Sequence, residues 1–396
     1  MIDTNPKKID ELLSRGVAEI IDGESFRQKL LSGKKLRIKF GIDPTSPNIH
    51  IGRATTLLKL RDLQELGHQI IFIIGDFTGV IGDTSDKDSE RPMLSAHVVG
   101  QNLKTYEKQA GKLLNLRKVK VYKNSAWLKK LGFSEITKQA DVFSVAQFIA
   151  RENIAKRLDA GKRVSLREVL YPLMQGYDSV QVKADIEIGG TDQKFNILAG
   201  RELQRAYKQT PQDIMLLPLL EGLDGRKMSS SWGNTINLTD IPADMYGKVM
   251  SLRDELIITY FTLATRVPLQ TVEYYKKDLA RGINPKDVKM RLAHELVRMY
   301  HGEKEAEKAQ NDFVQTFQKG GIPDTIQEAR VKKGDPLSEV VMKAQVVASK
   351  SEFRRLIEEG AVSEMETGEK ITDVNTTVSR PQTLKIGKKR FLKIIL

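Results

Sequence analysis

Short apolar runs alternate with helical patterns through the first 220 residues, and this alternation constrains the fold more than any other feature of the sequence. The runs are rich in isoleucine and valine, and we expect strands at residues 36–42, 69–76, 119–123, 182–188 and 213–220. Leucines recur at helical spacing between the first two runs, and Gly67 is placed to end that helix. Parallel strands joined by helices form a doubly wound α/β sheet. Such sheets bind ligands beyond the carboxyl ends of their strands.

The remaining chain predicts further units. Residues from about 85 to 165 read as a mostly helical insertion, so the first domain spans 1–235 with a glycine-rich loop at 223–235. Helical periodicity dominates residues 236–320, where Asn284 can cap a helix and Gly302 can end it. We expect a linker at 321–335 and a small α+β module at 336–396, whose helix at 349–360 opens with a capping box.

Charge and cysteine content narrow the functional classes. The 396 residues carry a formal net charge of +13 and no cysteine, which removes disulfides, thiolate metal sites and a cysteine nucleophile. The 5 histidines are too scattered for a histidine-rich metal cluster. No apolar stretch is long enough for a signal core or a membrane span, so we expect a cytoplasmic protein. The basic excess favours an anionic partner, either nucleic acid or a membrane surface.

The densest segment is FGIDPTSPNIHIGR, residues 40–53. A strand ends in glycine, a proline-containing loop follows, and a helix begins near His50. The free N–H groups and the dipole of a helix start suit phosphate. Gly52 allows a nucleotide to approach the backbone and His50 adds a donor, although taken alone the triplet could be coincidence. The pattern fits nucleotidyl transfer better than dinucleotide binding, because G-x-G-x-x-G is absent.

Three further segments carry polar groups at strand ends or on one helix face. In GDFTGVIGDTSDKDSER, residues 75–91, the carboxylates near the strand tip could bind an ammonium group or a metal, or belong to a solvated turn. In YPLMQGYD, Tyr171, Gln175 and Asp178 share one face of an otherwise apolar helix. IGGTDQKFN supplies glycines and Asp192, a natural acceptor for ribose hydroxyls.

The segment LLEGLDGRKMSSSWGN, residues 219–234, follows the last predicted strand. Glycines, serines, Arg226 and Lys227 describe a mobile loop whose cations could close on phosphates, with a solvated linker as the alternative.

Together these motifs identify a family. In their content and order, the segments ending in HIGR and beginning with KMSSS, with YPLMQGYD and GGTDQ between them, closely resemble those of the bacterial tyrosyl-tRNA synthetases. These are class I aminoacyl-tRNA synthetases, and the resemblance covers essentially the whole chain. It implies a Rossmann-like catalytic domain, a helical domain on the anticodon side and a C-terminal RNA-binding module. It also implies a homodimer that uses L-tyrosine, tRNA(Tyr) and ATP with Mg²⁺, without metal ligands of its own.

The resemblance also implies residue roles. Catalytic contacts to the phosphates would come from Thr45, His50, Lys87, Arg91 and Lys227. ATP would further meet Gly52, Arg53, Thr56, Gly190, Asp192, Met228 and Ser229. Tyrosine would be held by Lys39, Asp43, Asp83, Tyr171, Gln175, Asp178 and Gln193, with Asp178 accepting from the phenol. RNA phosphates would meet Lys350, Arg354, Arg355, Lys388, Lys389 and Arg390.

Three residues depart from the family pattern. Arg53 stands where the first signature usually has its second histidine, and Ser230 where the second signature usually has its second lysine. Lys39 stands where many bacterial members have a tyrosine that meets the substrate phenol. Strand alternation places Lys39 on the face of Gly41 and Asp43, where we expect it to contact Asp178 or the substrate hydroxyl.

Two other classes share some of these features. One is another nucleotidyltransferase with the first signature, which would not need YPLMQGYD, GGTDQ or an RNA module. The other is a non-catalytic RNA-binding descendant of a synthetase, for which Arg53 and Ser230 would be early losses. The location of the charge favours RNA over a membrane, since residues 380–396 carry 6 basic residues and no acidic one.

Overall fold

The computed structural model describes residues 2–83, 95–318, 327–347, 349–387 and 390–396. It divides into two compact units, Met1–Glu307 and Lys308–Leu396. Within the described residues no helix is both long and apolar enough to cross a membrane.

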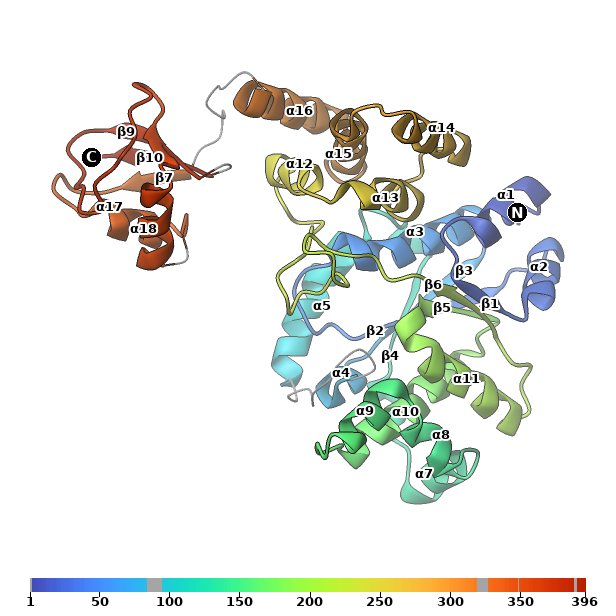
Figure 1. Ribbon diagram of the computed structural model, residues 1–396. Helices are drawn as coiled ribbons and strands as arrows, with labels where there is room; N and C mark the ends of the chain where they lie inside the picture. Colours follow the sequence, from blue (N-terminus) through green and yellow to red (C-terminus); the bar gives the residue numbers. More distant parts are fainter. Residues whose placement is uncertain (1, 84–94, 319–326, 348, 388–389) are drawn as a thin grey trace. The chain divides into compact units, whose positions relative to one another are not determined.

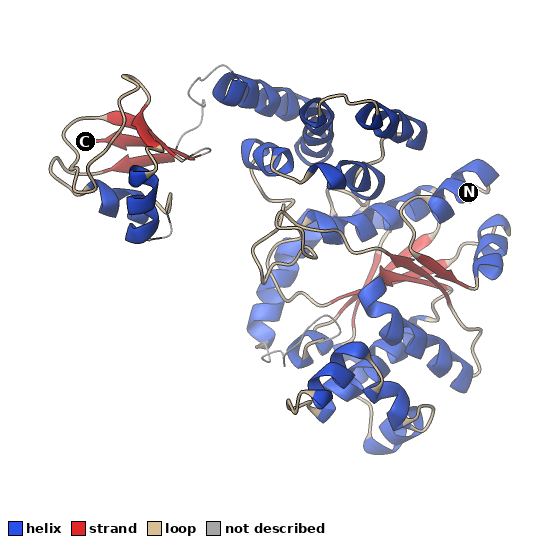
Figure 2. Cartoon of the chain, in the orientation of Figure 1, coloured by secondary structure: helices blue, strands red, loops and turns tan. Residues whose placement is uncertain are grey.

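A six-stranded sheet forms the centre of the first unit (Figure 2). Its strands are β1 (Glu19–Ile21), β2 (Arg37–Ile42), β3 (Gln69–Ile74), β4 (Lys120–Lys123), β5 (Ile186–Gly190) and β6 (Asp213–Leu217). Their order is β1-β6-β5-β2-β3-β4, and all neighbours are parallel except β1 and β6. The chain winds outward from β2 through β3 to β4, and in the other direction from β5 to β6. The winding direction therefore reverses between β2 and β5, which is where doubly wound sheets bind their ligands.

Helices cover both faces of this sheet. In chain order the helices of this part are α1 (Pro6–Ser14), α2 (Gly23–Leu31), α3 (Ile51–Glu65), α4 (Thr78–Ile81), α5 (Ala96–Ala110), α6 (Ser125–Leu128), α7 (Phe133–Ala140), α8 (Val145–Ile149), α9 (Glu152–Asp159), α10 (Leu166–Val182) and α11 (Lys194–Ala206). Helix α3 packs on β3 and β5, whereas α10 contacts β2 and α11 contacts β5 and β6. Figure 1 shows α3 on one side of the sheet and α10 with α11 on the other. The predicted α/β class and parallel sheet are confirmed.

Helices α10 and α11 pack closely because glycine lies at their contact. A β-carbon added to Gly176 would lie 2.9 Å from Leu203 Cδ1 and 3.1 Å from the backbone of Ala199 and Gly200. This close approach fixes α10, the helix that carries the YPLMQGYD segment, against the rest of the domain.

Two predictions about element boundaries need correction, and one strand was not predicted. The run at 182–188 is not one strand: α10 continues to Val182, Lys183 adopts a left-handed conformation with φ 49°, and β5 starts at Ile186. Alternating valines at the end of α10 belong to its buried face, which imitates a strand pattern. The helical insertion is shorter than 85–165, because β4 pairs with β3 and makes α5 a crossover helix. Strand β1 has only three residues and gave no periodic signal.

The first unit continues in helices, as predicted. They are α12 (Pro242–Met250), α13 (Ile257–Ala264), α14 (Leu269–Ala280), α15 (Pro285–His301) and α16, which spans Glu303–Gln318 across the division between the units. The predicted punctuation of α15 is confirmed: the Asn284 side chain accepts from the Lys286 N–H, and Gly302 follows with φ 93°.

In its described residues, the second unit contains the end of α16, a four-stranded sheet of order β7-β10-β9-β8 and the helices α17 and α18. Its elements are β7 (Gln327–Arg330), α17 (Leu337–Lys343), α18 (Lys350–Glu358), β8 (Val362–Glu364), β9 (Gln382–Ile386) and β10 (Arg390–Ile395). We expected a linker at 321–335, but β7 lies inside that range and pairs in parallel with β10. The mostly polar and mostly exposed side chains of β7 hide its strand character. Ser349 caps α18 by accepting from the Glu352 N–H, and Gly360 follows that helix with φ 62°.

Candidate active site

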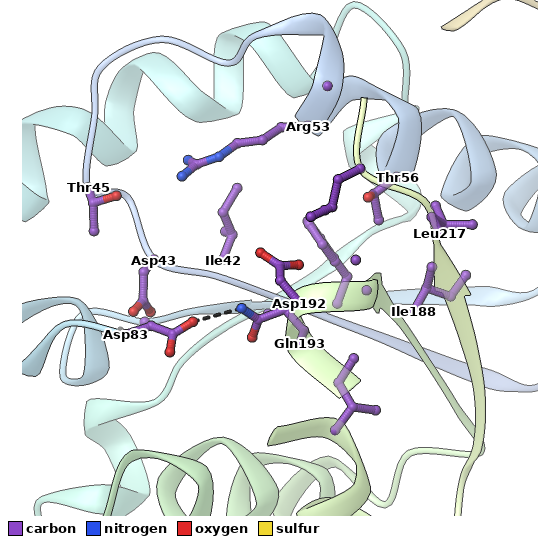
Figure 3. A pocket seen from close by; sticks show the side chains of 18 of the residues that line it. Ile42, Asp43, Thr45, Arg53, Thr56, Asp83, Ile188, Asp192, Gln193 and Leu217 are labelled. Carbon is purple, nitrogen blue, oxygen red and sulfur yellow. Dashed lines mark hydrogen bonds between the residues drawn. The ribbon is translucent and has the colours of Figure 1, made fainter. Parts of the chain in front are cut away.

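A cavity of about 270 Å³ opens beyond the carboxyl ends of β2 and β5 (Figure 3). It receives side chains from segments that are far apart in sequence: the β2–α3 loop, α10, the turn after β5 and the glycine-rich loop after β6. The predicted site residues that line it are Asp43, Thr45, His50, Gly52, Arg53, Thr56, Asp83, Tyr171, Gln175, Asp178, Gly190, Asp192, Gln193, Lys227, Met228 and Ser229. The sequence motifs therefore converge on one cavity.

His50 caps the N-terminus of α3 from a buried position. Its ring Nδ1 accepts the backbone N–H of Arg53 at 3.3 Å, so the ring hydrogen lies on Nε2. Burial, reinforced by the positive charges of Arg53 and Lys227, lowers the pKa of His50 to about 3. The imidazole is therefore neutral at physiological pH and offers a single N–H donor beside the helix start.

Arg53, in the first turn of α3, supplies charge near His50. Its guanidinium donates to the hydroxyl of Tyr106 on α5. Figure 3 shows Arg53 and Asp192 extending into the same cavity, with Thr45 on the loop that precedes α3. We call His50, Arg53 and Lys227 the basic side of the cavity; it suits the phosphates of a nucleotide.

Carboxylates occupy another part of the cavity. Asp43 accepts from Thr78 Oγ1 and from the Tyr171 hydroxyl, each at 2.8 Å. Asp83 accepts from Gln193 Nε2 at 2.7 Å, the bond drawn in Figure 3. Burial and the nearby Asp43 raise the pKa of the Tyr171 phenol well above its usual value, so it stays a neutral donor. We call Asp43 and Asp83 the acidic side; it suits an ammonium group.

Gly75 makes this arrangement of the acidic side possible. A β-carbon at that position would lie 1.8 Å from Asp43 Oδ1 and 2.3 Å from Thr78 Oγ1. No side chain larger than hydrogen fits there without displacing the carboxylate.

Asp178 is buried on α10 with its carboxylate partly satisfied by neutral donors. Trp127 Nε1 donates to Oδ1 at 2.8 Å and Asn124 Nδ2 to Oδ2 at 3.3 Å. Burial raises the pKa of Asp178 to about 7, although Lys39 and these two donors oppose the rise. A carboxylate held in this way can accept one further hydroxyl, such as a phenol.

Lys39 does not line the cavity, contrary to our expectation. Its ammonium pairs with Glu187 Oε1 at 2.9 Å and donates to Ser179 Oγ at 2.7 Å and to the Gln175 carbonyl at 2.9 Å. The direct contact to Asp178 that the strand alternation suggested is replaced by this pair with Glu187, which itself lines the cavity. The partner was hidden from sequence because Lys39 and Glu187 meet through the register of β2 with β5.

The glycine-rich loop borders the cavity on its basic side. Lys227 pairs with Asp192 Oδ2 at 2.8 Å, which joins the loop to the turn after β5. The buried Met228 accepts the Gly52 N–H through its sulfur at 3.3 Å, and Asn234 accepts the Ser229 N–H at 2.9 Å. The two signature segments are therefore in direct contact.

Other predicted residues lie elsewhere. Lys87, Arg91, Lys388 and Lys389 lie outside the described residues. In the second unit, Lys350 pairs with Glu339 at 3.2 Å and Arg355 with Glu359 at 3.8 Å, and both lysine and arginine are exposed, as is Arg354. Arg390 is half-buried and pairs with Glu352 at 2.8 Å.

Sequence reasoning missed Asn124, Trp127, Thr78 and Glu187. The first two follow the end of β4, and their position after a strand of a parallel sheet was the one available signal. Within the described residues, no cluster of three or more His, Cys, Asp or Glu side chains is arranged to hold a metal ion.

Comparisons with known proteins identify the family. Residues 31–318 match the model of the class I tRNA synthetases for tryptophan and tyrosine. The chain is 45% identical to the tyrosine–tRNA ligase of Dehalococcoides mccartyi over 98% of each chain, and 46% identical to that of Carboxydothermus hydrogenoformans over 97% of each. The chain belongs to the bacterial tyrosyl-tRNA synthetases. The match between this synthetase and these relatives extends through its C-terminal unit.

Solved structures agree on the fold of the synthetase. The truncated mitochondrial tyrosyl-tRNA synthetase of Aspergillus nidulans superposes with a TM-score of 0.66 at 20% identity, over 78% of this chain and 94% of that one. The tyrosyl-tRNA synthetase of Archaeoglobus fulgidus, solved with L-tyrosine, gives 0.61 at 23% identity, over 77% and 99%. At these identities the likeness concerns the fold alone.

Proposed function

We propose that this synthetase joins L-tyrosine to the 3′-terminal ribose of tRNA(Tyr) in two steps within the cavity described above. In the first step the tyrosine carboxylate attacks the α-phosphorus of ATP, forming the adenylate and releasing pyrophosphate. In the second step the ribose hydroxyl of the tRNA takes the tyrosyl group and AMP leaves. The observation that carries the proposal is one cavity with an acidic side, a basic side and a buried carboxylate acceptor.

Tyrosine is oriented at its two polar ends, the ammonium and the phenol, in this proposal. Its ammonium lies on the acidic side, near Asp43 and Asp83, with Tyr171, Gln175 and Gln193 around it. Its phenol donates to Asp178, whose Trp127 and Asn124 contacts leave room for one more donor. A phenylalanine side chain would leave this buried carboxylate without its third donor, which is unfavourable.

ATP is held by backbone and cations. Asp192 accepts a hydrogen bond from a ribose hydroxyl once Lys227 has left that carboxylate. The nucleotide is surrounded by Gly52, Thr56, Gly190, Met228 and Ser229. The phosphates meet Thr45, the neutral N–H of His50, Arg53 and Lys227, with Lys87 and Arg91 completing the set. A carboxylate is already a competent nucleophile, so the side chains contribute by positioning two anions and stabilising the charge that builds on phosphorus.

Three further parts of the proposal concern partners and location. Mg²⁺ enters on ATP, bound by phosphate oxygens, as Mg²⁺ prefers. The second unit binds tRNA phosphates through Lys350, Arg354, Arg355, Lys388, Lys389 and Arg390, and the enzyme acts in the cytoplasm.

A homodimer is supported by apolar side chains that lie exposed on the helices between β4 and α10 and at the start of α10. Phe133 is 87% exposed, Val145 74% and Leu166 71%. In this proposal a second copy of the chain covers these exposed apolar side chains.

ATP–pyrophosphate exchange tests the proposal directly. We expect exchange with tyrosine to exceed exchange with phenylalanine or tryptophan, followed by charging of tRNA(Tyr). A protein that binds tRNA without any exchange would instead be a non-catalytic descendant. Exchange without an amino acid requirement would indicate another nucleotidyltransferase.

A further inference from the structure

The Lys39–Glu187 ion pair is buried at the wall of the cavity, which Glu187 lines and Lys39 does not, and it has no part in the mechanism above. The two side chains are 0% and 2% exposed. Burying an ion pair is rarely favourable for stability alone, since desolvation offsets the attraction. The position of this pair, between the sheet and the helix that carries Asp178, suggests a functional reason for it.

The hydrogen bonds of Lys39 exclude a direct contact with substrate. An ammonium has three donors, and those of Lys39 are used by Glu187, by Ser179 and by the Gln175 carbonyl. No hydrogen remains for a phenol. Lys39 must therefore act through other residues.

The network connects two strands to one helix. Glu187 on β5 accepts from Ser179 Oγ at 3.1 Å and from Gln212 Nε2, in addition to Lys39. Gln175 and Ser179 lie three residues before and one after Asp178 on α10. Fixing both of them fixes the rotation of α10 and, with it, the direction in which Asp178 faces.

The network also sets the local charge. Two carboxylates, Asp178 and Glu187, and one ammonium, Lys39, share a dry environment, where Lys39 favours the ionised form of Asp178 and Glu187 opposes it. The other groups that face Asp178 are the neutral donors Trp127 and Asn124 and the phenol of Tyr171.

We infer that Lys39 and Glu187 are a positioning pair for tyrosine recognition: they orient Asp178 and balance its charge, so that it is an ionised acceptor for the phenol. The inference rests on the proposed function of Asp178. It assigns to Lys39 an indirect role in specificity, and it makes Glu187 a specificity-determining residue as well.

Removing the charge of Lys39 and removing that of Glu187 should shift the pH midpoint of tyrosine binding in opposite directions. A pair with only a structural role would not give opposite shifts. Lys39→Met removes the favourable charge, so the pH midpoint for tyrosine binding should move upward. An upward shift of about one unit weakens tyrosine binding roughly fivefold at pH 7. Glu187→Gln removes the opposing charge and keeps the shape, so the midpoint should move downward and binding at pH 7 should tighten up to about twofold.

The experiment measures the dissociation constant of tyrosine between pH 5.5 and 8.5, a window in which the substrate phenol, with a pKa of about 10, stays protonated. The proteins are the full-length wild type, Lys39→Met, Glu187→Gln and a control, Lys29→Met. Lys29 pairs at 2.9 Å with the buried Asp213, which begins β6 at the end of that strand away from the cavity. Its loss should lower stability without moving the midpoint. The rate of adenylate formation at saturating tyrosine should change much less than the affinity in both test variants.

Shifts in the same direction, or no shift, with an active wild type would overturn the inference. A wild type without tyrosine-dependent exchange would instead overturn the proposed function, so the two failures are distinct. If Lys39→Met does not fold, the isosteric Glu187→Gln decides alone: an unmoved or raised midpoint contradicts the inference.

Discussion

The sequence predicts many of the residues that line this site, but not the residues with which each of them forms hydrogen bonds or ion pairs. The sequence placed Tyr171, Gln175 and Asp178 on one helix face, and all three line the cavity. It could not place Asn124 and Trp127 against Asp178, because that contact depends on how the segment after β4 packs on α10. Lys39 was assigned to the correct strand and face, but its partner depends on strand pairing across 148 residues of chain, from Lys39 to Glu187.

Asp178 is the residue on which discrimination between tyrosine and phenylalanine should depend. Asp178→Ala removes a buried, charge-assisted acceptor, so we expect the tyrosine preference to fall roughly ten- to hundredfold. Pyrophosphate exchange with each amino acid measures it. Because its pKa is about 7, tyrosine affinity in the wild type should also weaken as the pH falls below 7 and the carboxylate takes up a proton. An unchanged preference in the variant would refute the role.

His50 should act as a neutral donor in the transition state. His50→Ala is expected to slow adenylate formation about 10²- to 10³-fold with little change in tyrosine affinity, since the contact strengthens as charge builds on phosphorus. His50→Gln retains an N–H and should recover part of that rate. Single-turnover rates with tyrosine titrations separate binding from chemistry.

The pH dependence of His50 gives an independent check. With a pKa of about 3, the ring stays neutral from pH 6 to pH 8, so it should contribute no inflection to the rate there. Because the pKa of His50 is lower in the folded protein than the value of about 6.5 in the unfolded chain, the neutral ring stabilises the fold fully above pH 6.5. This stabilisation is lost as the pH falls toward 3. A histidine inflection near 6.5 that disappears in His50→Gln would contradict this assignment.

At the scale of elements, hydrophobic periodicity located most helices and strands. It did not reveal how closely the elements pack on one another, because that depends on backbone contacts between distant segments. The end of α10 was misread because buried valines alternate there, and β7 was missed because its side chains are mostly exposed. Neither error affected the site, since the strand ends that define it carry the glycine and proline signals. The packing of α10 on α11 was not visible in the sequence, although it positions three of the residues proposed to bind tyrosine.

Gly176→Ala tests that packing. The added methyl would meet the α11 backbone at 3.1 Å, which cannot yield as a flexible side chain can, so we expect a loss of about 1–3 kcal/mol in the free energy of unfolding and weaker tyrosine binding. Urea unfolding and tyrosine titration measure the two effects. The control is Gly247→Ala in α12, where nothing lies within 4 Å and a gain of about 0.5–1 kcal/mol is expected from helix propensity. Equal effects in both variants would show that α10 does not depend on this contact.

At the scale of the whole molecule, the two units have separate cores. The second unit has its own hydrophobic cluster, built by α17, α18 and its strands, to which Ala329 beside β10 also contributes. The sequence predicted this module, but it placed the start near residue 336, nine residues after β7 begins at Gln327. A cut at the predicted linker would therefore break a sheet.

A chain ending at Gln318 should keep α16 whole and lose the module that contains β7 to β10. We expect tyrosine-dependent pyrophosphate exchange to persist, because the cavity is lined by residues 40–231. Affinity for tRNA should fall roughly 10- to 1000-fold and its dependence on salt should flatten, since several phosphate contacts are removed together. Aminoacylation and binding assays at two salt concentrations measure this. Undiminished charging by the shortened protein would assign the module another role.

The contact of Lys227 with Asp192 has a consequence for the order of events at the nucleotide. Without nucleotide, the cation proposed for the phosphates neutralises the carboxylate proposed for the ribose. When a ribose hydroxyl displaces the lysine, the released ammonium finds its new counter-ion on the same incoming molecule. Binding of the ribose would thus release the ammonium that is proposed to act on the phosphates. We therefore expect a phosphate compound without a ribose to leave Lys227 paired with Asp192 and to bind more weakly than a nucleotide.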